Sequence, residues 1–125
     1  MQINDFMNFG PLNQAKDYAI SQVLTMIINS RISGAGKVQD CRFESKNNSL
    51  KLSILFNEEP SPFNVTVTGV GFLKESRELY VTYEDLRISR SWMDQLYHDI
   101  VEPEILGGKR LQVPEKYAEK LLLIL

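Results

Sequence analysis

His98 and Asp94 are the residues whose types and spacing could support acid–base chemistry. His98 is the only histidine among 125 residues. Asp94 precedes it by four residues in a segment with helical spacing, so its carboxylate can reach the imidazole and raise its basicity. The same spacing is also that of an ordinary pair of exposed side chains on one helix. A small enzyme that uses His98 is therefore our third hypothesis of function, and no residue is assigned a catalytic role.

Cys41 is the only cysteine, which excludes an internal disulfide. One cysteine and one histidine cannot build a zinc site within one chain. Cys41 shares a predicted strand face with Phe43, which indicates a small buried hydrophobic residue rather than a nucleophile. Gly36-Lys37 lacks the following Ser or Thr of a phosphate-binding loop, and no calcium loop or metalloprotease helix is present. We therefore expect no metal and no cofactor.

The composition is that of an ordinary globular domain, with 43% hydrophobic and 24% charged residues. A net charge of −2 gives no electrostatic reason to expect binding to nucleic acid. The first ten residues have neither the basic nor the apolar region of a signal peptide. No run of apolar residues is long enough to span a bilayer. We expect a cytoplasmic protein with no membrane span.

Residues 63–89 are the segment around which the other elements are organised. Phe63, Val65 and Val67 alternate with polar residues, and the same alternation returns after a charged turn at 74–78, so the segment predicts one long β-hairpin. Folding the segment about this turn so that paired residue numbers sum to 151 places Phe72 opposite Leu79. The alternation breaks once in each arm, nearly face to face, and glycines accompany the first break. This pattern predicts a strongly curved hairpin that wraps around a helix.

The remaining elements complete an α+β fold in a single domain, 1–125. We expect an N-terminal helix packed in a curved four-stranded antiparallel sheet of two hairpins, followed by two C-terminal helices. Asn13 is the predicted cap of the first helix, Ser91 with Asp94 the predicted cap of the second, and Pro103 its predicted end. The pattern of residues 105–113 is compatible with either a small hairpin or an open loop. The expected segments are an irregular stretch at 1–12, a helix at 13–32, hairpins at 38–56 and 63–89, and helices at 91–101 and 114–125.

The 91–101 helix is predicted to have one apolar and one polar side. Its apolar stripe consists of Trp92, Met93, Leu96, Tyr97, Ile100 and Val101. Its opposite side carries Asp94, Gln95, His98, Asp99 and Glu102. Over residues 13–101 the order of elements is similar to that of cystatin-type helix-and-meander domains and of small bacterial lipid-binding folds, a resemblance that implies an architecture and no function.

The sequence has more apolar residues than a single hydrophobic core would bury. This excess motivates the leading hypothesis of function, a non-catalytic protein-interaction module that forms a homodimer. The predicted interface residues are Phe6, Phe9, Leu122 and Leu125, near the two ends of the chain. The second hypothesis is a carrier of an apolar small molecule or lipid, in a cavity between sheet and helices. The residues predicted to line that cavity are Phe63, Phe72, Tyr83 and Trp92.

Overall fold

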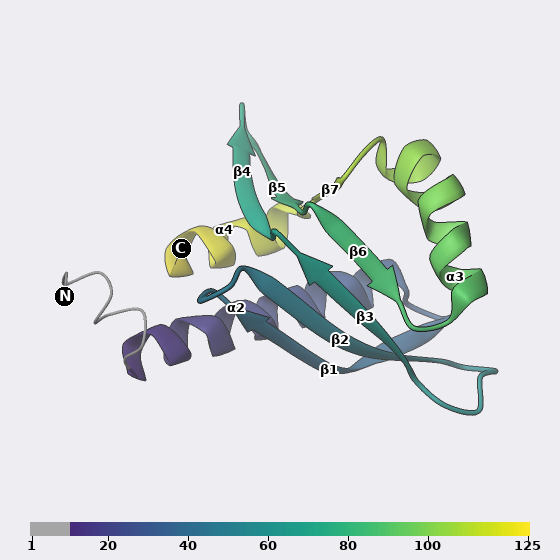
Figure 1. Cartoon of the computed structure of the whole chain (residues 1–125). Helices are drawn as coiled ribbons and strands as arrows, with labels where there is room; N and C mark the ends of the chain where they lie inside the picture. The colour runs from purple at the N-terminus through teal and green to yellow at the C-terminus, as the bar shows by residue number, and fades with distance from the viewer. Residues whose placement is uncertain (1–10) are drawn as a thin grey trace.

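The computed structural model describes the backbone of residues 11–125 and the side chains from residue 13 onward. It has the predicted α+β architecture, with one N-terminal helix, antiparallel strands and two C-terminal helical segments (Figure 1). The elements are α2 (Pro11–Arg31), β1 (Gly36–Glu44), β2 (Ser49–Phe56), β3 (Phe63–Thr68), β4 (Gly71–Glu75), β5 (Glu78–Thr82), β6 (Asp85–Ile88), α3 (Ser91–Leu96), η1 (Tyr97–Leu106), β7 (Arg110–Gln112) and α4 (Glu115–Ile124).

The strands form two antiparallel sheets rather than the predicted single sheet. Sheet A has the order β1-β2-β3-β6, and sheet B has the order β4-β5-β7. The 63–89 hairpin belongs to both, because its base lies in sheet A and its tip in sheet B. Figure 1 shows the tip turning away from sheet A. The hairpin passes from sheet A to sheet B at the two facing breaks in its apolar–polar alternation, as predicted. There Gly69 has a φ of +66°, and the Glu84 N–H donates to the Thr68 carbonyl (2.9 Å).

The predicted register of this hairpin is wrong by two residues. Phe72 pairs with Val81 rather than Leu79, and Ile88 pairs with Val65 rather than Phe63. The cause is a tighter turn, in which Glu75 still pairs with Glu78 and Ser76 takes a left-handed φ of 57°. A shift of two preserves which side chains face the core, since strand side chains alternate with a period of two.

The helix α2 packs against sheet A and also covers its outer edge at β1. Its buried residues Ile20, Val23, Leu24 and Ile27 join the apolar face of the sheet in one core. Its polar side chains accept backbone hydrogen bonds from the edge, which satisfies groups that an edge strand leaves unpaired. These bonds run from Phe43 N to Ser21 Oγ (2.9 Å), from Val38 N to Asn29 Oδ1 (2.8 Å) and from Ser45 N to Asp17 Oδ2 (3.0 Å).

Several predicted helix ends are wrong. The helix α2 begins at Pro11, because proline fits the first helical position, so Asn13 lies inside the helix and donates to Ser45 Oγ. In α3 the capping residue is Arg90, with no side-chain hydrogen bond to the helix end. Pro103 does not end the second helix, which continues to Leu106 as a π-helix. The wider winding accommodates a proline ring that would crowd an α-helical turn.

The last elements attach to sheet B. Residues 110–112 form β7, which pairs with β5, so this stretch is neither a small hairpin nor a loop. The helix α4 follows Pro114 and packs through Leu121, which is completely buried. It lies against α2 and β5, as Figure 1 shows. The α3–η1 helix instead stands at the other side of the molecule, along β6.

Candidate functional site

His98 lies at the outer edge of β6, between that strand and its own helix. Its Nε2 is 2.7 Å from the Leu86 carbonyl oxygen, and a carbonyl only accepts, so Nε2 carries a hydrogen. Asp94 Oδ1 is 3.6 Å from the same nitrogen and accepts the Ile88 N–H (2.8 Å). The predicted neighbourhood of His98 and Asp94 is therefore present, but each side chain bonds the strand rather than the other.

The hydroxyls of Tyr97 and Tyr83 and the Glu102 carboxylate are hydrogen-bonded in series beside His98. The Tyr83 hydroxyl donates to Glu102 Oε2 (2.8 Å), so the contact between Tyr83 and Tyr97 (2.5 Å) has Tyr97 as the donor. Glu102 Oε2 is also 3.7 Å from His98 Nδ1. Burial raises the pKa of Tyr83, and its hydrogen bonds to Tyr97 and Glu102 raise it further. Burial likewise raises the pKa of Tyr97, with the Glu102 charge adding to the effect, so both hydroxyls remain protonated donors.

This arrangement suits anchoring better than proton transfer. A histidine that acts on a substrate needs one ring nitrogen directed at it. In this site Nε2 of His98 is held by a backbone carbonyl, and Nδ1 faces the Glu102 carboxylate. Asp94 and His98 supply hydrogen-bond partners to the edge strand β6, as three polar side chains of α2 do for the edge strand β1. The cluster thus fastens α3–η1 to sheet A by its polar side.

The consequence is a helix that turns Asp94, His98 and Glu102 toward the protein and leaves part of its apolar stripe facing outward. Met93 is buried, but Trp92, Leu96 and Ile100 are 59%, 46% and 47% exposed. We call these three residues the outer row. Successive members are four residues apart, so they share one helix face. The predicted division of this helix is therefore wrong, because hydrogen bonds to β6 and Tyr83 determine which side turns inward. The amphipathic pattern alone carried no signal of those partners.

The four residues predicted to line a cavity lie in separate places. Phe63 is buried and packs edge-to-face on Phe56 (5.0 Å). Phe72 packs on Phe43, with 6.0 Å between the ring centroids. Tyr83 is hydrogen-bonded to Tyr97 and Glu102, and Trp92 belongs to the outer row. Phe72 borders a hollow of about 250 Å³ that is also lined by Lys16, Asp17 and Leu125, among others. Typical ligand pockets span about 300–1,000 Å³ and are mostly apolar.

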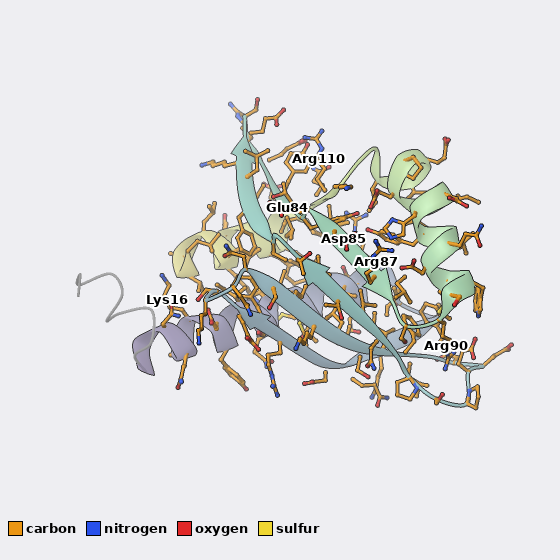
Figure 2. All side chains as sticks on the ribbon, viewed as in Figure 1. Lys16, Glu84, Asp85, Arg87, Arg90 and Arg110 are labelled. Carbon is orange, nitrogen blue, oxygen red and sulfur yellow. The ribbon has the colours of Figure 1, made fainter. Side chains whose placement is uncertain are left out.

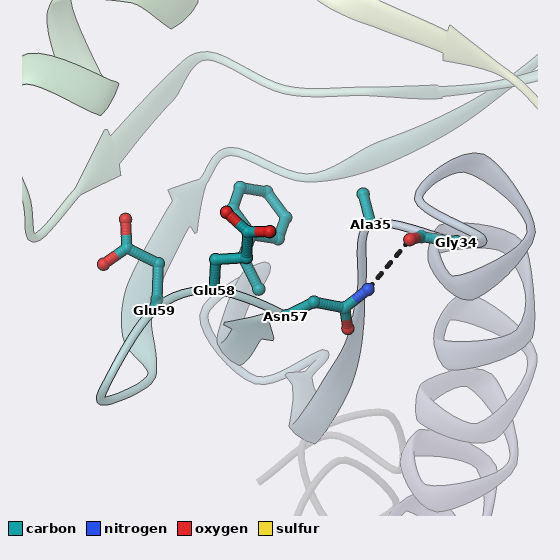
Figure 3. A pocket seen from close by; sticks show the side chains of 6 residues that line it. Gly34, Ala35, Asn57, Glu58 and Glu59 are labelled. Carbon is teal, nitrogen blue, oxygen red and sulfur yellow. Dashed lines mark hydrogen bonds between the residues drawn. The ribbon is translucent and has the colours of Figure 1, made fainter.

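A second hollow of about 370 Å³ lies between the end of α2 and the β2–β3 connection. Figure 3 shows Asn57 bridging this gap through its side-chain amide, which donates to the Gly34 carbonyl (2.8 Å). Glu58 and Glu59 line it, and Glu59 also pairs with Arg90 (2.7 Å). The carboxylates and the amide make this hollow a poor match for the apolar ligand of the carrier hypothesis.

Charged side chains of both signs lie along β6 and its continuation. Figure 2 shows Asp85, Arg87 and Arg90 along this line, and Arg87 pairs with Asp85 (3.1 Å). Among residues 11–125, no cluster of three or more metal-ligating side chains is found. No helix in the same range is both long and apolar enough to cross a membrane.

Two of the four predicted interface residues fall within the described chain. Leu122 and Leu125 are 44% and 48% exposed, and their neighbour Leu123 is 87% exposed. Phe6 and Phe9 lie outside the described residues. Comparison with known protein families, with curated proteins and with solved structures finds no match to this chain.

Proposed function

We propose that the protein is a non-catalytic interaction module that pairs with a second copy of itself through the end of α4. The observation that supports the proposal is the exposed group of Leu122, Leu123 and Leu125 on a helix whose Leu121 is completely buried. Leucines exposed together on a well-anchored helix are characteristic of association surfaces. In a two-fold contact each copy covers the same leucines of the other.

The charges on α4 are compatible with such a contact. Two glutamates and two lysines precede the leucines, at Glu115, Lys116, Glu119 and Lys120. Their charges cancel, so two copies meet without net repulsion from this helix. The proposal includes a cytoplasmic location, which the single thiol supports because disulfides are rare in a reducing compartment.

Sedimentation equilibrium over a wide range of protein concentrations tests the proposal. We expect the mass to rise from 14.4 kDa to twice that value, and Leu123→Glu to shift the equilibrium strongly toward the monomer. Leu73→Glu is the matched control, since Leu73 is 42% exposed on a different element, and it should leave the dimer intact. A wild-type monomer at all concentrations, or a dimer indifferent to Leu123→Glu, contradicts the proposal. Native mass spectrometry adds a check, because a discrete bound mass favours a carrier instead.

A further inference from the structure

We infer that the outer row of α3–η1 is a second interaction surface, which binds a basic amphipathic helix of a partner protein. This surface is distinct from the leucines of α4. It consists of Trp92, Leu96 and Ile100, which are exposed on successive turns of one helix. Tryptophan is among the residues most enriched at the energetic centre of protein interfaces, and this one is the only tryptophan of the chain.

The structure holds the outer row in its exposed position. Rotating the helix to bury it would break the Asp94 bond to the Ile88 N–H and the His98 bond to the Leu86 carbonyl. It would also separate Glu102 from the Tyr83 hydroxyl and expose Met93. Each broken bond would leave a partly buried polar group without its partner, which is unfavourable because water replaces that partner poorly. The row is therefore presented ready-made, and a partner spends little energy ordering it.

The charges around the row specify the kind of partner. Residues 91–108 contain four acidic residues, namely Asp94, Asp99, Glu102 and Glu104, and no lysine or arginine. Asp99 and Glu104 are exposed. The nearest cations along the chain already have partners, because Arg90 pairs with Glu59 and Lys109 donates to the Glu84 carbonyl. An apolar row with an acidic rim complements apolar residues flanked by lysine or arginine, and it repels a second copy of itself.

A helix is the partner structure that fits this row. An exposed stripe with a spacing of four residues packs against the ridges of another helix. Addition of a strand is disfavoured at this place, because the β6 edge is already bonded by Asp94 and His98. An anionic membrane is disfavoured by the same acids, since helices that lie on such membranes carry basic polar faces.

Fluorescence of Trp92 measures binding at this surface directly, because no other tryptophan contributes. The probe is a synthetic amphipathic helix of leucine and lysine, compared with a peptide of the same pattern in which glutamate replaces lysine. We expect a saturable blue shift with the lysine peptide that weakens as salt is added, and none with the glutamate peptide. Leu96→Gln with Ile100→Gln should weaken binding about tenfold or more.

Matched variants keep the inference falsifiable. Leu73→Gln removes a leucine of similar exposure from β4 (42%, against 46% for Leu96) and should leave peptide affinity unchanged. Asp99→Lys with Glu104→Lys should reverse the preference between the two peptides. Circular dichroism and melting temperature verify that each variant is folded, as expected for exposed positions.

Three results overturn the inference. The first is lysine-peptide binding that is unaffected by Leu96→Gln with Ile100→Gln. The second is a blue shift caused by protein concentration alone, which indicates that this face pairs with a second copy. The third is an equal shift with vesicles of phosphatidylserine and phosphatidylcholine, which indicates a membrane surface. None of these results bears on dimerisation through Leu123, so the two proposals fail separately.

Discussion

Removing the Tyr83 hydroxyl should destabilise the protein more than removing the exposed hydroxyl of Tyr80, which lies on the preceding strand β5. In Tyr83→Phe the Glu102 carboxylate loses its 2.8 Å donor, and the Tyr97 hydroxyl loses its acceptor. The Glu102 side chain is only 14% exposed, so water replaces the lost donor poorly. The fold itself should persist, because phenylalanine retains the ring that packs in the core.

The expected magnitude follows from the charged acceptor. A hydrogen bond to an ionised group contributes about 1.5–3 kcal/mol, and partial solvation of Glu102 reduces this toward about 2 kcal/mol. For a chain of this size that loss lowers the melting temperature by roughly 6–8 °C. A second change, Glu102→Leu, removes the stranded carboxylate. The double variant should therefore lose less stability than the sum of the single variants, with a coupling of about 1 kcal/mol or more.

Chemical denaturation of the four proteins of this double-mutant cycle gives the coupling directly. Tyr80→Phe is the control, because Tyr80 also donates to a glutamate, Glu78 (2.5 Å), but does so on the exposed surface. It should leave the unfolding midpoint unchanged within error. Equal losses for Tyr83→Phe and Tyr80→Phe, or additive losses in the cycle, refute the view that a buried polar network anchors α3–η1.

Three further predictions concern pH and the hairpin. The pKa values of the Tyr83 and Tyr97 hydroxyls are raised above 10 in the folded protein. The stability that these protonated hydroxyls contribute is therefore complete below pH 10 and is lost as the pH rises further. Alkaline denaturation monitored by circular dichroism should accordingly be less steep in Tyr83→Phe. Burial raises the pKa of Cys41 to about 11, so at pH 8 a thiol reagent should modify the native protein far more slowly than the denatured chain, and equal rates contradict this. Gly69→Ala should lower the unfolding free energy by about 1–2 kcal/mol, since φ is +66° there and a Cβ would meet the Glu84 side chain at 2.4 Å; Glu84→Ala in the same chain should restore only the part due to that contact, as urea denaturation can measure.

Local patterning was sufficient to predict the fold class and the two segments that contain β1 to β6, but it did not predict β7. The alternation of Phe63, Val65 and Val67 identified β3 and its buried face, and the facing breaks identified the point at which the hairpin changes sheets. The register required the turn geometry, because a two-residue shift leaves the same side chains inside. Nothing in the charged turn revealed that Ser76 would take a left-handed conformation.

The candidate site was predicted only in part, for a physical reason. Sequence spacing placed His98 and Asp94 on one helix, and the structure places them together. Their actual partners are the backbone of Leu86 and Ile88, and backbone groups leave no trace in a sequence pattern. The usual assumption that apolar residues face inward therefore assigned Trp92 to the wrong side of its helix.

The hairpin shared by the two sheets has a consequence for fragments of the chain. A cut between Ser76 and Arg77, at the hairpin tip, would leave β1 to β4 on one piece and β5 to β7 on the other. Each piece would then hold incomplete portions of both sheets, with β3 lacking β6 and β4 lacking β5. Neither piece can complete a core alone, while the two together can restore both strand pairs. The tip is therefore the point at which one cut would separate both strand pairs of the hairpin, β3 from β6 and β4 from β5.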